Sequence, residues 1–160
     1  MILTAVTLFH TLISLVGIGS GFVVVYGLLD SKRFDGWTGL FLTTTVATSV
    51  TGFLFPAHHF LPSHAVGILS LIVLTIAILA RYRYHLSGAW RRTYVVTAVT
   101  ALYLNVFVLI VQLFLKMPSL KAIAPTQSEP PFQIAQLLAL LLFAFLGIRS
   151  AMKFQLTRES

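Results

Sequence analysis

The sequence predicts an all-α integral membrane protein, a bundle of five transmembrane helices with its N-terminus outside and its C-terminus in the cytoplasm. Two observations predict this class. Of the 160 residues, 58% are hydrophobic and only 9% are charged, whereas a soluble domain usually carries about 25% charged residues. The apolar residues also form five runs, each close to the about 20 residues that cross a bilayer. The length fits one domain over residues 1–160.

Each expected helix is bounded by charged residues or prolines. We expect helices over about 2–29, 37–55, 64–80, 93–115 and 132–148. In chain order, the boundaries are the charged stretch 30–33, Pro56, Arg81, the pair Arg91 and Arg92, Lys116, the double proline at 130–131, and Arg149. The first run lacks a basic leader and is too long for a signal peptide, so we expect it to be retained. The stretch 117–131, with four prolines, is expected to be irregular.

The distribution of Lys and Arg predicts the orientation. When alternate connections are grouped, nine of the eleven Lys and Arg residues fall on one side: two in 30–36, four in 81–92 and three in 149–160. The other side has two, Lys116 and Lys121. Cytoplasmic loops carry the excess of positive charge, so the nine are expected inside. Because the basic residues lie between apolar runs and form no stripe with aromatic residues, we do not expect a nucleic-acid partner.

Small and hydroxylated residues indicate helix packing. Gly17 and Gly21 are four residues apart, a spacing that lets another helix approach closely. Thr44, Thr48 and Thr51 share one face of the second helix, where their hydroxyls can bond to their own backbone or to a neighbour. The chain has no cysteine, which excludes disulfides, thiolate metal sites and thiol catalysis.

Four of the five histidines are expected at the outer membrane level, and they are the candidate ligands. They are His10, His58, His59 and His64. Polar residues near the outer ends of the fourth and fifth helices, and an amide facing the bundle, are possible supporting groups. These are Glu129, Gln112, Gln133, Gln136 and Asn105. Ionisable groups are rare at membrane depth and often mark functional sites.

Imidazole suits three kinds of chemistry here. His10 and His64, at the outer ends of two helices, could ligate a haem b that passes electrons to or from a quinone or a periplasmic partner. Three imidazoles, with or without Glu129, could hold Zn²⁺, Cu²⁺ or Fe²⁺. Alternatively, the histidines and Glu129 could exchange protons with a bound quinone. We therefore predict a small protein of the bacterial inner membrane that binds haem or a metal, in redox work or as an accessory subunit.

Two other classes remain open. The chain could be a structural or assembly subunit of a larger membrane complex, without any ligand, in which the histidines only cap helix ends. It could also form a small-solute transporter or channel as a homo-oligomer, although no helix carries a central charge. No residue is assigned a catalytic role, because no serine lies in a nucleophile elbow and no phosphate-binding glycine loop is present.

Overall fold

The computed structural model describes residues 1–154, and every regular element in that range is helical. In chain order the elements are α1 Ile2–Leu29, α2 Asp35–Gly52, α3 Pro62–Ile78, the π-helical turn η1 Leu79–Arg83, α4 Ala89–Lys116, α5 Pro118–Ile123 and α6 Pro130–Lys153. The expected helix over 2–29 is confirmed in its bounds. The tail, including Arg158, lies outside the described residues.

Four of the described helices are long and apolar enough to cross a membrane: α1, α3 with η1, α4 and α6. The all-α membrane class is therefore confirmed, whereas the expected count of five is not. The exception is α2, which has 18 residues, begins with Asp35 and contains six threonines. Hydroxyls such as that of Thr48 bond to the backbone carbonyl one turn earlier, as expected, at 2.8 Å. These polar side chains make α2 less apolar than its neighbours.

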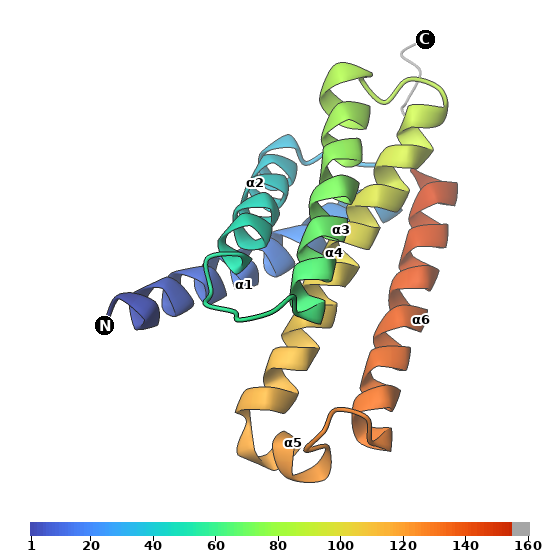
Figure 1. Ribbon diagram of the computed structural model, residues 1–160. Coiled ribbons are helices and arrows are strands. Elements are labelled where there is room, and N and C mark those ends of the chain that lie inside the picture. The colour runs from blue at the N-terminus through green and yellow to red at the C-terminus, as the bar shows by residue number, and fades with distance from the viewer. Residues whose placement is uncertain (155–160) are drawn as a thin grey trace.

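The helices pack around α4, which contacts α1, α3 and α6, while α1 and α2 form the most extensive pair. In Figure 1, α1 is inclined to α4 and α6, so that the N-terminus lies well away from α5. The connection 117–131, expected to be irregular, contains the short helix α5. Proline is tolerated in the first turn of a helix, because the N–H it lacks would have no partner there. Pro118 therefore starts α5 instead of preventing it.

Close approach of α1 to its neighbours depends on glycine. A Cβ atom on Gly21 would lie 2.6 Å from Leu102 Cδ1 of α4 and 3.0 Å from the ring of Phe41 on α2. A Cβ atom on Gly17 would lie 3.2 Å from the hydroxyls of Thr44 and Thr45. The small-residue face expected from the sequence is thus the surface against which α2 and α4 pack.

The bundle has two chemically different ends. At the first, which we call the basic end, α1, η1 and α6 finish and α2 and α4 begin. Ser31 Oγ donates to the Lys153 carbonyl there, which ties the end of α1 to the end of α6. The second, which we call the histidine end, comprises His10, the last turn of α2, the connection 53–61 and the first turn of α3. His10 joins α1 to α2 at this end.

Candidate functional site at the histidine end

His10 is held by the last turn of α2. Its Nδ1 lies 2.8 Å from Thr51 Oγ1. The Thr51 hydroxyl has one proton, which it donates to the Ala47 carbonyl at 2.7 Å. With its proton directed to the Ala47 carbonyl, the hydroxyl accepts from His10, and this arrangement corresponds to a neutral ring that carries its proton on Nδ1 and keeps the lone pair of Nε2. Phe55 packs edge-on against the imidazole, with ring centroids 5.1 Å apart.

His64 is held in the opposite tautomer. The backbone N–H of Leu61 donates to His64 Nδ1 at 3.0 Å, which caps the beginning of α3. A neutral imidazole that accepts at Nδ1 carries its proton on Nε2. The ring is stacked on Phe53, with centroids 5.6 Å apart, and tilted against Phe60 at 5.5 Å. In this state neither nitrogen of His64 offers a lone pair to a ligand.

The other two candidate ligands, His58 and His59, lie in the exposed connection between α2 and α3. Within residues 1–154, no three histidine or carboxylate side chains come together in a group that could hold a metal ion. His10 binds to α2, and His64 caps its own helix. The structure therefore does not bring together the three-imidazole arrangement that the sequence suggested.

The glutamines among the expected supporting residues bond elsewhere in the bundle. Gln136 Nε2 donates to the Phe107 carbonyl of α4 at 3.3 Å, and Gln133 Nε2 donates to the Ser128 carbonyl at 2.8 Å. Gln112 is half-buried near the end of α4. These amides lie where α4, α5 and α6 meet, and Figure 1 shows this region apart from the N-terminal end of α1. Gln136 thus joins α6 to α4 and Gln133 bonds to the connection before α6, and no hydrogen bond joins these amides to His10 or His64 in the described residues.

Glu129 organises the connection before α6. Its carboxylate accepts from the hydroxyl of Thr126 at 2.7 Å and from the backbone N–H groups of Thr126 and Ser128 at 3.2 and 3.1 Å. The hydrogen bonds, chiefly that from the Thr126 side chain, lower the pKa of Glu129 below its ordinary value. A carboxylate immediately before a helix also interacts favourably with the helix dipole. Glu129 therefore has a local structural role.

Asn105 lies deep in the bundle, 6% exposed, at the contact of α1, α2 and α4. Its side-chain carbonyl accepts from Ser14 Oγ at 3.0 Å. An amide at this depth is costly unless it is paired. The contact joins α1 to α4 and confirms that this amide faces the bundle, where its Nδ2 has no hydrogen-bond partner among the described residues.

Sequence reasoning missed a buried charge at the basic end. Arg81 is only 5% exposed and forms an ion pair with Asp35, the first residue of α2. Its guanidinium lies 5.4 Å from the ring centroid of Tyr94 and 5.7 Å from that of Tyr82. The sequence had suggested only a border residue facing the cytoplasm. The sequence did not indicate the π-helical turn over Leu79–Arg83, which contains Arg81. Such turns are often found at functional sites.

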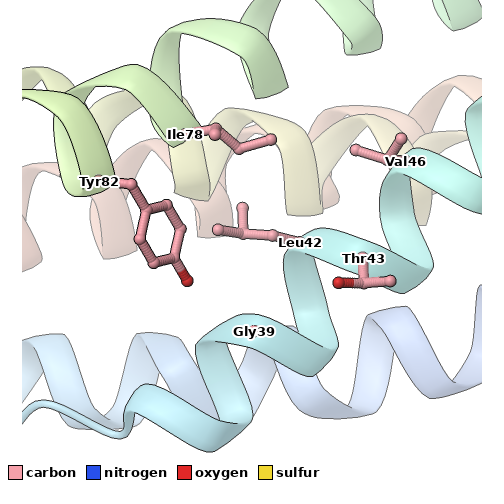
Figure 2. Close-up of a pocket in the computed structure, with 6 residues that line it drawn as sticks. All are labelled: Gly39, Leu42, Thr43, Val46, Ile78 and Tyr82. Atoms are coloured by element: carbon pink, nitrogen blue, oxygen red, sulfur yellow. The ribbon is translucent and has the colours of Figure 1, made fainter.

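A shallow groove of about 400 Å³ runs between α2 and the end of α3. It is lined by Gly39, Leu42, Thr43 and Val46 on one side and by Ile78 and Tyr82 on the other. Figure 2 shows the Tyr82 ring standing at one end of the groove and Thr43 on the opposite helix. No group that is charged at neutral pH lines it, so it suits an apolar occupant such as a lipid chain.

The chain was compared with protein-family models, with curated proteins and with solved structures, and none matched.

Proposed function

We propose that the chain crosses the bacterial inner membrane five times, with the histidine end outside and the basic end in the cytoplasm. The fifth crossing would be α2. Its 18 residues span about 27 Å at the rise of an α-helix, close to the thickness of the hydrocarbon core. It connects the end of α1 to the start of α3, and its hydroxyls bond to its own backbone. The excess of Lys and Arg at the basic end supports the orientation.

We infer that the protein is an accessory subunit of a larger membrane assembly. The observation that carries this is the exposure of α6, in which Phe143 and Ser150 are the only buried residues. Its outer face is almost wholly apolar and includes Leu137, Leu138, Leu141, Phe145 and Ile148, each more than half exposed. Such a face fits either lipid tails or the helix of another subunit. The pairs His10–Thr51 and Ser14–Asn105, in contrast, join helices within the bundle.

Because the chain contains no cysteine, single-cysteine cross-linking can test this role. Leu141→Cys places a thiol on the outer face of α6, and Leu69→Cys places one at a similarly exposed site on α3. In native membranes we expect Leu141→Cys to form a cross-linked product of one defined mass and Leu69→Cys to form none. Cross-linking by neither variant, together with a monomer on native electrophoresis, would contradict the proposal.

A second candidate function is ligation of haem b or of a Zn, Cu or Fe ion by His10. The supporting observation is the hydrogen bond between His10 Nδ1 and Thr51, because an Nδ1–H that donates to the hydroxyl leaves the Nε2 lone pair available. A ligating histidine normally donates its other N–H in this way. His64 fits less well, because it would have to release the Leu61 N–H to become a ligand. The other ligands would come from His64 in a changed state or from a partner subunit.

A haem held there would supply electron transfer to a quinone or a periplasmic redox partner. Absorption spectroscopy and metal analysis of one purified sample test this candidate. A Soret band that is lost in His10→Ala supports haem, and stoichiometric Zn, Cu or Fe without that band supports a metal ion. A colourless, metal-free protein that remains folded and in its assembly would rule out this second candidate, and the accessory role would be the only proposed function that remains.

A further inference from the structure

Positive charge at the basic end exceeds the carboxylates that could neutralise it. Among the described residues, this end has two carboxylates. Asp30 pairs with Lys32 at 2.5 Å, and Asp35 pairs with both Arg33 and Arg81. The remaining cations at this end form no ion pair within residues 1–154, and they are Arg83, Arg91, Arg92, Arg149 and Lys153.

One of these arginines lies at the mouth of an apolar groove. The groove has a volume of about 460 Å³ and lies between α4 and α6. It is lined by Arg92, Val96, Gly147, Ile148, Ala151 and Met152. Arg92 supplies its only charge. Gly147 and Ala151 are one turn apart, and their small size opens the groove along α6; a Cβ atom on Gly147 would be 3.5 Å from Val99 of α4.

We propose that this groove binds an anionic phospholipid, with the phosphate at Arg92 and one acyl chain along the groove. Arg92 is exposed, and a guanidinium can donate two parallel hydrogen bonds to a phosphate. From Arg92 the groove continues one turn deeper to Val96 on α4 and from Met152 to Ile148 on α6. Charge therefore lies at the membrane surface and apolar surface lies below it. This is the order of groups in a phospholipid.

The groove between α2 and α3 provides an internal comparison. Its size is similar, but its lining contains no cation. A lipid chain there gains apolar contact without any preference for a charged headgroup. We therefore expect only the α4–α6 groove to select an anionic lipid, and we expect Arg92 to be the residue that selects it.

Native mass spectrometry of the full chain in mild detergent tests the proposal. The probes are phosphatidylglycerol and phosphatidylcholine with identical acyl chains, titrated separately. We expect the wild-type chain to prefer phosphatidylglycerol and Arg92→Gln to reduce that preference about five-fold, the effect of one cation near an anionic headgroup. Arg83→Gln removes an unpaired arginine outside the groove and should leave the preference unchanged.

Two further variants separate the groove from general charge. Arg92→Lys keeps the charge and should retain most of the preference. Gly147→Leu fills the groove while Arg92 stays, and should weaken binding of phosphatidylglycerol. Gel filtration and thermal unfolding show that each variant is folded. Equal binding of both lipids by the wild-type chain, an unchanged preference in Arg92→Gln, or an equal loss in Arg83→Gln would overturn the assignment.

Discussion

His10 and Thr51, 41 residues apart in sequence, share a hydrogen bond of 2.8 Å that joins α1 to α2. When Thr51 donates its proton to the Ala47 carbonyl, the imidazole donates at Nδ1. At His64 the Leu61 N–H imposes the reverse arrangement. Two histidines near the same end of the bundle thus differ in their hydrogen bonds. His10 binds to Thr51 through Nδ1, whereas His64 caps the start of α3.

Thr51→Val should remove the acceptor for His10. We expect a loss of about 1 kcal/mol of unfolding free energy, the usual net contribution of one hydrogen bond. The ¹⁵N NMR signals of His10 should also change from those of the Nδ1–H form to those of a tautomer mixture. Thr75→Val is the control, because Thr75 is bonded only to its own backbone on an exposed face of α3. A His10 spectrum that is unchanged in Thr51→Val would refute the tautomer assignment.

Asp35→Asn should destabilise the protein more than Asp30→Asn. The partner of Asp35, Arg81, is almost fully buried, so the substitution leaves a buried cation without its counterion. Removing one partner of a fully buried pair costs about 3–5 kcal/mol; because Asp35 is largely exposed, we expect about 1–2 kcal/mol after solvent screening. Asp30 and Lys32 are both about half exposed, and their pair should contribute less than about 1 kcal/mol. Equal unfolding midpoints for the two variants would contradict this ranking.

Gly21→Ala and Gly19→Ala form a matched pair on α1. A Cβ atom at position 21 would meet Leu102 at 2.6 Å, whereas one at position 19 would have no neighbour within 4 Å. Overpacking of this kind costs about 1–3 kcal/mol, while replacing glycine by alanine at an open helical site favours the helix by about 0.5–1 kcal/mol. Thermal unfolding in detergent should therefore shift in opposite directions for the two variants. A shift of the same sign and size in both would show that α1 does not pack closely at Gly21.

The hydrogen bonds of Glu129 should make the connection before α6 sensitive to acid. The pKa of Glu129 is lowered in the folded chain, chiefly by the Thr126 side chain, so its stabilising contribution is complete above the ordinary value of 4.5. That contribution is lost as the pH falls through the lowered pKa. Hydrogen exchange at the Thr126 and Ser128 amides should show protection at pH 7 that decreases at low pH. In Glu129→Gln the protection should be low and independent of pH, and equal protection in the two proteins would disprove the role.

The positions of the long helices could be predicted from the sequence because the signal is local. Apolar runs of sufficient length, interrupted by charges and prolines, define α1 over Ile2–Leu29 and the other crossing helices within a few residues. The helix α2 was also predicted, but its crossing of the membrane stays a prediction, because a run of threonines reduces its apolar signal. The short helix α5 was missed, because four prolines suggested only an irregular connection.

The contacts of individual polar groups depended on the tertiary structure. His10 bonds to Thr51 of α2, whereas Gln133 bonds to the Ser128 carbonyl and Gln136 to the Phe107 carbonyl. Counting residues along straight helices had predicted one common level for the three side chains, but it could not show which groups each of them binds. The burial of Arg81 depends on a π-helical turn and on Asp35, 46 residues earlier in the chain. Membrane insertion follows from apolar length, which each segment carries by itself. A hydrogen bond or an ion pair requires two groups within about 3–4 Å, and only the packing of the helices decides which groups approach that closely.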